Sequence, residues 1–228
     1  MTSVRLGASV VLTRLSRPSS AIGLTVALLA VLAGALFERR TGSALATDRA
    51  LAGVALGLVL PLFAHGTVSR ALAGTRLDSA LSEIARHGGS RKSATLGVLL
   101  VVVPALALTG ATLAAVAVVV TRAPLDPLLV RDAMTSSWIG ALGGACYAAW
   151  FMLGSTLGRR GGGRGWALAL DWVLGAGATA IALPLPRGHL RNLLGAEPIL
   201  AMPQWSATLA LCLLGGLYVG IALWRAPS

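Results

Sequence analysis

Six long apolar runs, each of 17 to 27 residues, constrain the fold of this chain more than any other feature of its sequence. The runs occupy residues 21–37, 50–68, 94–120, 138–157, 166–185 and 205–224. An α-helix needs roughly 20 apolar residues to cross the ~30 Å hydrocarbon layer of a bilayer, so each run has about the length of a membrane span. Lipid offers no hydrogen-bond partner to the backbone and the runs lack the alternation of barrel strands, so we expect helices.

The composition agrees with this interpretation, since 56% of the residues are apolar, 12% are charged and the mean hydropathy is +0.79. A water-soluble domain of this composition would expose much hydrocarbon to solvent. The sequence therefore predicts an all-α integral membrane protein, with a bundle of six transmembrane helices formed by residues 21–228. Pro61 and Pro104 lie inside the second and third runs and each removes a backbone donor, so we expect bends there.

The distribution of Lys and Arg predicts the orientation. Twelve of the nineteen basic residues lie in the N-terminal segment, in the second and fourth connections and at the C-terminus, whereas five of the eight acidic residues lie in the other connections. The positive-inside rule therefore places both termini in the cytoplasm. Arg outnumbers Lys eighteen to one, which is typical of GC-rich bacterial genomes, so we expect a multi-pass protein of the bacterial cytoplasmic (inner) membrane.

The net charge of +11 has the same explanation. It reflects the positive-inside bias and an attraction to the headgroups of the lipid bilayer, and we expect no nucleic acid as a partner.

Residues 1–20 form a separate basic segment with a helical pattern. Its apolar residues recur at i, i+4, i+7, i+8 and i+11, and they are Val4, Ala8, Val11, Leu12 and Leu15. This spacing predicts an amphipathic helix over residues 3–16 at the inner membrane interface. The alternatives are an irregular basic leader and a cleavable signal peptide, but the 17-residue run that follows exceeds a usual signal core.

The loop of residues 69–93 is polar, and its pattern predicts one cytoplasmic surface helix of about three turns from Arg76 to His87. Its apolar face comprises Leu77, Ala80, Leu81 and Ile84, and its charged residues include Arg76, Glu83 and Arg86. Thr75 and Asp78 have the spacing of a capping box, and Gly88 with Gly89 offers a stop. Such a helix either docks on a partner or rests on the bilayer as a connector.

Six spans, an interfacial N-terminal helix and one cytoplasmic helix between spans two and three resemble the permease subunit of the ABC-2 family of ATP-driven exporters. The stretch "LSEIARHGGSRKSATLGVLL" (81–100) is similar to the family's pattern of a helix, a small-residue break, Ser-Arg and immediate entry into span three. The resemblance implies that the predicted helix is a coupling helix that docks a separate ABC ATP-binding subunit. It also implies a homodimer or heterodimer of permease subunits.

We expect this chain to bind no cofactor, no metal and no ATP, and to have no catalytic residues of its own. Its only lysine, Lys92, lies in "GGSRKS", which lacks the glycine of a phosphate-binding loop, so ATP and Mg would be held by the partner subunit.

A second local resemblance lies between spans five and six. The stretch "PLPRGHLRNLLG" (184–195) falls where the family has a short outer re-entrant element, which implies such an element over residues 186–204 with His189 and Arg191 in it. His189, Leu190, Leu193 and Leu194 would share one of its faces.

Two polar residues inside the apolar runs are candidates for a gate or pathway. Asp171 is the only acidic residue in a run, and His65 lies three residues from the inner end of the second run, so the two could meet at similar depth. A charge in a membrane is costly unless it is paired. The alternatives are a purely structural pair, or an Asp171 that reaches back to Arg164 or Arg70.

Parts of the sequence also fit three other functional classes. Glu83, Ile84, Ala85 and Gly89 keep part of the loop motif of importer permeases, although that loop normally lies late in the chain. Ser155 in "GSTLG" suggests an intramembrane serine protease but has no nearby base. A non-catalytic scaffold is the third alternative.

Small residues complete the pattern of the runs. Cys146 and Cys212 lack metal-ligand spacing, so we interpret them as small buried hydrophobes. GxxxG spacings, which permit close helix approach, begin at Gly140, Gly154 and Gly216.

Overall fold

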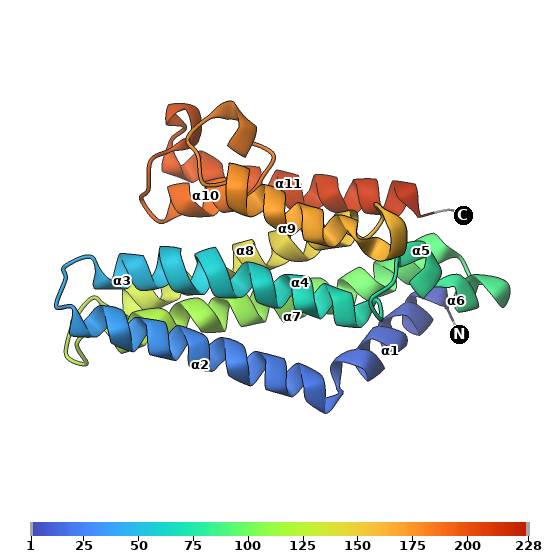
Figure 1. Cartoon of the computed structure of the whole chain (residues 1–228), viewed down its shortest axis with the longest axis horizontal. Coiled ribbons are helices and arrows are strands. Elements are labelled where there is room, and N and C mark those ends of the chain that lie inside the picture. The colour runs from blue at the N-terminus through green and yellow to red at the C-terminus, as the bar shows by residue number, and fades with distance from the viewer. Residues whose placement is uncertain (1, 227–228) are drawn as a thin grey trace.

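The computed structural model describes residues 2–226, and these residues form helices and connecting turns without any strand (Figure 1). The α-helices are α1 (Ser3–Leu15), α2 (Pro18–Arg40), α3 (Ala46–Arg49), α4 (Leu60–Ala71), α5 (Leu77–Ala80), α6 (Ser82–Arg86), α7 (Arg91–Thr121), α8 (Leu129–Gly154), α9 (Gly163–Leu174), α10 (Pro186–Leu193) and α11 (Gln204–Arg225). A π-helix, Ala50–Val59, joins α3 to α4, and short 3-10 turns cover Arg159–Gly161, Ala180–Ala182 and Ile199–Ala201.

Four of the helical segments are long and apolar enough to cross a membrane. They are Pro18–Arg40, Ala46–Ala71, Arg91–Thr121 and Gln204–Arg225, and they coincide with the first, second, third and sixth apolar runs. The prediction of an α-helical, multi-pass membrane protein is therefore confirmed.

Helix α8 covers the fourth run but begins nine residues before it, at Leu129, and ends at Gly154. Its 26 residues reach about 39 Å, which exceeds the thickness of the hydrocarbon layer. Glycines and polar side chains lower its hydropathy below that of the four apolar helices. This composition suits its central position, because its buried residues, including Tyr147 and Phe151, face α4, α7, α9 and α11 rather than lipid.

The fifth apolar run does not form the continuous helix predicted over residues 166–185. Helix α9 ends at Leu174, so its 12 residues cover only about 18 Å. Gly175 and Gly177 follow at once, and Pro184 and Pro186 disfavour helical geometry at the residues before them. Figure 1 shows α9 ending part-way along the bundle, with α10 farther along the same direction.

The two prolines differ in effect. The hydrogen bonding changes from π to α at Leu60, directly before Pro61, so this site does depart from regular α-helix. Pro104 lies inside α7, which continues as one helix on both sides of it.

Glycines bring three helices into backbone contact. A Cβ added at Gly7 of α1 would lie 2.1 Å from the carbonyl oxygen of Ala94 in α7, and one at Gly97 would lie 2.1 Å from that of Val4. Gly110 and Gly140 face each other in the same way between α7 and α8. A helix is present at Ser3–Leu15, within the segment predicted to be helical, and it packs on α7 through Gly7 while Leu12 is exposed.

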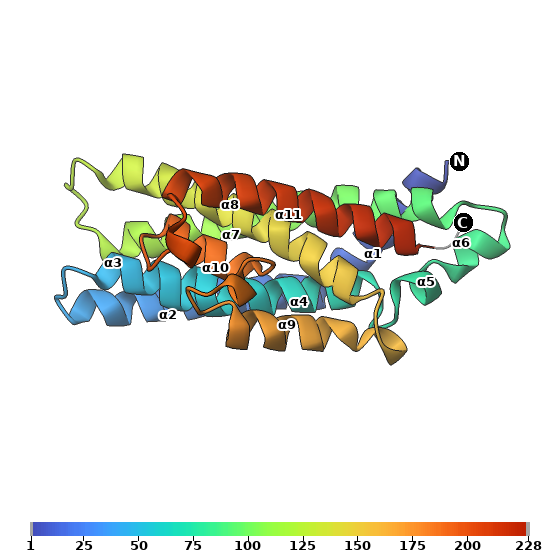
Figure 2. The ribbon, with the colours of Figure 1, turned by 90° about the horizontal axis from the view of Figure 1, so that it is seen from above.

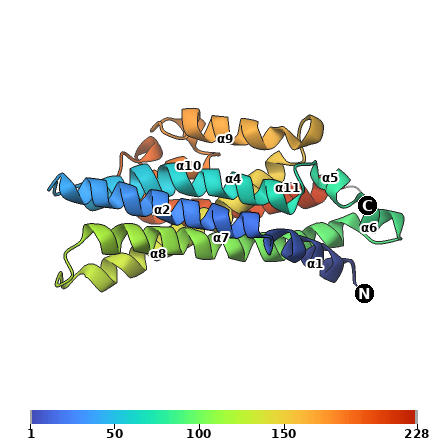
Figure 3. The ribbon, with the colours of Figure 1, turned by 60° about the horizontal axis from the view of Figure 1, so that its bottom comes forward.

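The two ends of the bundle differ. The N-terminal end of α1, the C-terminal end of α11 and the short helices α5 and α6 lie together at one end, which we call the inner end (Figures 1 and 2). The α2–α3 and α7–α8 connections lie at the opposite, outer end. Figure 3 shows α9 at the edge of the bundle, on the far side of α4 from α7.

Candidate functional site

The inner loop contains two short helices instead of the single helix predicted from Arg76 to His87. Helices α5 and α6 are separated at Leu81, whose backbone (φ −109°, ψ 7°) is not helical. The expected capping box is not formed, because the Thr75 hydroxyl donates to the carbonyl of Leu72 (2.7 Å) and the Asp78 carboxylate accepts from the backbone N–H of Ser79 (2.8 Å).

The predicted stop after this segment is present. Gly88 adopts a left-handed backbone (φ +77°), and the N–H of Gly89 donates to the carbonyl of Ile84 (2.9 Å).

The apolar face of the loop points into the bundle. Leu77 and Leu81 are 1% and 2% exposed, and Ala80 and Ile84 are half-buried against the same core. Leu77 and Leu81 therefore cannot form the docking surface for which they were candidates.

The solvent-facing side of the loop is polar. Its exposed residues include Ser79, Glu83, Arg86 and His87, and Arg76 is half-buried beside Asp78, whose carboxylate lies 3.2 Å away. Glu83 and Arg86 form an ion pair of 2.6 Å with both side chains about 70% exposed, so the pair contributes little to stability. These side chains are free to contact another molecule.

Three hydrogen bonds attach residues 75–90 of the loop to other parts of the bundle. The N–H of Ser90 donates to the Ser3 hydroxyl of α1 (3.1 Å), and the N–H of Leu77 donates to the carbonyl of Ser155 after α8 (3.3 Å). The Arg164 guanidinium at the start of α9 donates to the carbonyl of Thr75 (3.0 Å). The inner loop is thus tied to α1, α8 and α9 at once.

The Ser155 hydroxyl donates to the carbonyl of Met152 one turn earlier (2.6 Å), and the residue is fully buried. This hydrogen bond is the ordinary one of a serine at a helix end and gives no activated nucleophile.

Asp171 is fully buried and has two hydrogen-bond donors. The Tyr147 hydroxyl donates to Oδ2 (2.8 Å), and the backbone N–H of Arg187 donates to Oδ1 (3.0 Å). Arg187 also donates through its guanidinium to the carbonyl of Trp172 (3.3 Å). The carboxylate therefore fastens α9 to α8 and to the N-terminal end of α10, where negative charge is favoured.

The partners considered from the sequence are not the partners of Asp171. Arg164 binds Thr75, and Arg70 donates to the carbonyl of Ser19 (3.2 Å). His65 packs edge to face on Phe151 (5.6 Å between ring centres), and Phe151 stacks on Tyr147 (5.9 Å). Within residues 2–226, His65 and Asp171 share no hydrogen bond, and the rings of Phe151 and Tyr147 form one connection between them.

Tyr147 and Arg187 are the contacts that sequence reasoning missed. A tyrosine in the middle of an apolar run was the available signal, because a buried phenol needs a partner.

The outer element predicted at residues 186–204 contains α10 and the 3-10 turn Ile199–Ala201. His189 is 1% exposed, with Nε2 2.8 Å from the carbonyl oxygen of Leu183. Leu190 and Leu193 are buried with it, and Leu190 contacts the α8 backbone near Gly143. Arg191 remains half-exposed, and its carbonyl accepts from the N–H of Ala196 (2.9 Å).

An ion-paired cluster lies at the outer end. Arg122 donates to Asp126 (2.8 Å) and to Asp132. The backbone N–H of Leu128 and the Arg122 guanidinium hold the pKa of Asp126 below its ordinary 3.8. The same two carboxylates raise the pKa of Arg122.

The described residues hold no group of His, Cys, Asp and Glu side chains placed to bind a metal ion. Cys146 is buried as expected, whereas Cys212 is exposed on the outward face of α11, so the interpretation of Cys212 as buried is wrong.

Comparisons of this chain with protein-family models, with curated proteins and with solved structures gave no match. The function is therefore inferred from the geometry of the candidate site. This site consists of the exposed polar side of the inner loop and the buried Asp171 contact, which are connected because Arg164 and Asp171 both belong to α9.

Proposed function

We propose that this chain is the membrane-spanning permease subunit of an ATP-driven exporter of the ABC-2 type. In this proposal the inner loop, residues 69–93, docks a separate ATP-binding subunit that holds ATP and Mg. The observation that carries the proposal is the attachment of residues 75–90 of this loop to α1, α8 and α9 by three hydrogen bonds.

A docking element has to present groups to a partner and to transmit the partner's movement. Ser79, Glu83, Arg86 and His87 present polar groups to the aqueous side of the inner end. Leu77 and Leu81, buried in the core, make the loop move together with the helices rather than independently of them. In this proposal the exposed polar side chains contact the partner, instead of the apolar face expected from the sequence.

Movement of the loop would reach α9 through Arg164. Thr75 is bonded to Arg164 in the first turn of α9, and Asp171 two turns later is bonded to α8 and α10. Displacement of α9 would therefore strain the hydrogen bonds that join Asp171 to α8 and α10. Packed contacts of this kind can switch between discrete arrangements.

The six-span architecture belongs to the same proposal. Helix α8 would supply the fourth passage, and α9 with α10 would supply the fifth as a broken passage. A single bundle with this packed core offers a narrow pathway, so two such subunits would assemble as a homodimer or heterodimer. Both termini would lie in the cytoplasm of a bacterium.

Affinity capture tests the proposal. The C-terminally tagged protein, extracted gently from its native membrane, is expected to bring down an ATP-binding subunit in stoichiometric amount. Arg86→Glu and His87→Glu should abolish this capture, because both side chains are exposed and each substitution places a negative charge on the proposed docking surface. The matched control is Arg159→Glu, an exposed arginine of the α8–α9 connection at the same end.

Capture without an ATP-binding subunit, from cells that express the protein in folded form, would overturn the proposal. Equal capture by Arg86→Glu and by Arg159→Glu would overturn the docking surface. Leu81→Asp is unsuitable here, because a charge at this buried position would disturb the fold itself.

A further inference from the structure

A basic pocket of about 520 Å³ lies at the inner end, between the last turn of α1, the first turn of α2 and the last turn of α4. Its lining residues are Arg14, Arg17, Ser19, Ser69, Arg70, Ala73 and Gly74. Three of them are arginines and none is acidic. Within residues 2–226, none of the three arginines takes part in a salt bridge.

The arginines are held in place by backbone carbonyls. Arg14 donates to the carbonyl of Ala71 (2.7 Å), and Arg70 donates to that of Ser19 (3.2 Å), which leaves other N–H groups of each guanidinium unused. The Nε of Arg70 is buried and has no hydrogen-bond partner. Burial and the positive charge of the nearby Arg17 lower the pKa of Arg14. The pocket therefore holds positive charges that no acidic side chain compensates.

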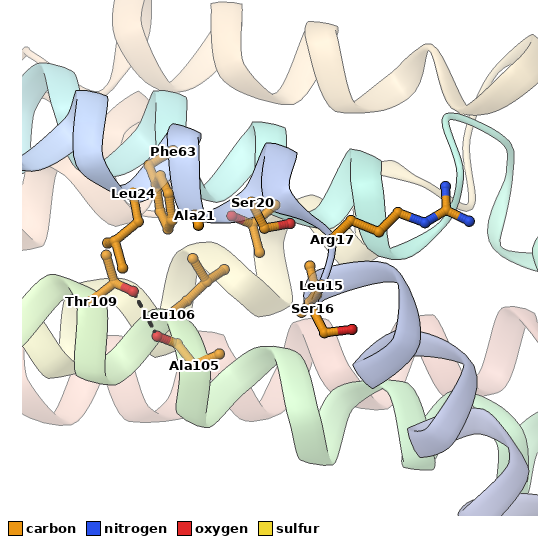
Figure 4. Close-up of a pocket in the computed structure, with 11 residues that line it drawn as sticks. Leu15, Ser16, Arg17, Ser20, Ala21, Leu24, Phe63, Ala105, Leu106 and Thr109 are labelled. Atoms are coloured by element: carbon orange, nitrogen blue, oxygen red, sulfur yellow. Dashed lines mark hydrogen bonds between the residues drawn. The ribbon is translucent and has the colours of Figure 1, made fainter.

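Two apolar cavities adjoin this pocket, one on each side of α2. The first, of about 340 Å³, lies between α2, α4 and α7 and shares Arg17 with the basic pocket (Figure 4). The second, of about 310 Å³, lies between α2 and α4 and shares Arg70. Figure 4 shows Leu24, Phe63 and Leu106 around the first cavity, with the Arg17 guanidinium extended away from them.

One more polar atom lies at the junction. The Ser20 hydroxyl lines the first cavity, is buried and has no hydrogen-bond partner. A buried hydroxyl of this kind is costly unless a ligand or water satisfies it. An ester carbonyl placed just below a phosphate group would accept its hydrogen.

We infer that these three spaces form one binding site for an anionic two-chain phospholipid of the inner leaflet. The phosphate lies among Arg14, Arg17 and Arg70, near the N-terminal end of α2, and one acyl chain enters each apolar cavity. A free phosphate or phosphate ester would use only the basic pocket. The apolar cavities on both sides of α2 favour the lipid as the source, and the inference does not depend on the proposed function.

Native mass spectrometry of the purified protein tests the site. The probes are dioleoyl phosphatidylglycerol, dioleoyl phosphatidylcholine and glycerol 3-phosphate, each added separately. We expect one tightly held phosphatidylglycerol, with an affinity at least about tenfold above that for phosphatidylcholine, since each arginine near the headgroup contributes several-fold. Glycerol 3-phosphate should compete only weakly, because it lacks the chains.

The variant R14Q/R17Q/R70Q should lose the preference for phosphatidylglycerol. The matched control R159Q/R160Q/R225Q removes as many exposed arginines from the same end and should retain it. Two milder variants guard against misfolding: Arg17→Gln changes an exposed side chain, and Ala21→Trp fills the first cavity from an exposed position of α2. Each should weaken binding severalfold while the thermal unfolding temperature without lipid stays unchanged.

Equal binding of the two lipids by the wild type would overturn the inference. Equal loss of preference in the two triple variants would also overturn it, because the attraction would then come from net charge alone. Tight binding of glycerol 3-phosphate, unaffected by Ala21→Trp, would show a phosphate site without a lipid.

Discussion

At the scale of single residues, Asp171 connects more elements than any other polar side chain in the interior. Its two oxygens accept from Tyr147 of α8 and from the backbone of Arg187 in α10, while its own backbone belongs to α9. These contacts explain why an acidic residue is tolerated in an apolar run. At the break between α9 and α10, the carboxylate accepts from one backbone N–H, that of Arg187, which has no preceding helical turn to donate to.

Removal of this carboxylate should destabilise the fold in a graded way. Asp171→Ala leaves the Tyr147 hydroxyl and the Arg187 N–H unpaired, which costs about 1–3 kcal/mol for each group. Tyr147→Phe removes one donor and should cost about 1 kcal/mol. Thermal unfolding in detergent, followed by tryptophan fluorescence, measures the order of the two losses. Normal stability of Asp171→Ala together with lost transport would instead assign the residue to a gate.

The outer Asp126 predicts a pH effect. Its pKa is lowered in the folded protein, so its contribution to stability is present above the ordinary pKa of 3.8 and is lost as the pH falls through the lower folded value. Asp126→Asn should therefore lower the unfolding temperature at neutral pH and have little effect once the wild-type carboxyl is protonated. A constant difference between the two proteins across this pH range would contradict the assignment.

At the scale of elements, backbone contact between α7 and α8 holds the centre of the bundle. A Cβ at Gly140 would lie 2.2 Å from the carbonyl oxygen of Gly110, and one at Gly144 would lie 2.0 Å from that of Leu106. Of the three GxxxG spacings in the sequence, the one at Gly140 thus has a clear packing role. Gly216 and Gly220 have no atom within 4 Å of their would-be Cβ atoms.

Alanine substitution should separate these two groups of glycines. Gly140→Ala forces α7 and α8 apart and should cost about 1–3 kcal/mol by overpacking. Gly216→Ala and Gly220→Ala are the matched controls and should leave the unfolding temperature of the isolated chain unchanged or slightly raised. Equal effects at Gly140 and Gly216 would show that the α7–α8 contact is not as close as described.

The elements also show what the sequence could and could not predict. Runs such as 94–120 predict helices because hydrocarbon leaves the backbone no alternative, and α1 was recognisable from its 3.6-residue spacing. The break after Leu174 was missed because Ala, Leu and Gly in this run are apolar whether the chain is helical or not. The bend at Leu81 was missed because periodicity identifies an apolar face but not the core that it meets.

In the whole molecule, the distribution of Arg along the chain agrees with the arrangement of the helices. The connections that are rich in Arg lie at the end that also holds α5, α6 and the N-terminal end of α1 (Figure 1). The candidate site could be predicted only in part. Loop 69–93 was identified from its polarity, but its docking residues and the partners of Asp171 depend on contacts between segments far apart in the chain, which one sequence does not reveal.

The orientation can be tested by labelling single cysteines in a Cys212→Ser background. Leu125→Cys lies in the α7–α8 connection, where Leu125 is 95% exposed, and should react with a membrane-impermeant maleimide added outside intact cells. Ser79→Cys in α5 should react only after the membrane is opened, since the proposed orientation places it in the cytoplasm. The reverse pattern would invert the topology and remove the inner loop from the reach of any ATPase.

If the inner loop docks an ATP-binding subunit, its polar side must lie against that subunit in the native membrane. Photocrosslinking from a benzophenone side chain placed at Ser79, with the same group at Leu125 as the control, measures this contact. We expect a covalent adduct with an ATP-binding subunit from position 79 and none from position 125. Adducts with lipid alone from position 79, or the same protein adducts from both positions, would contradict it.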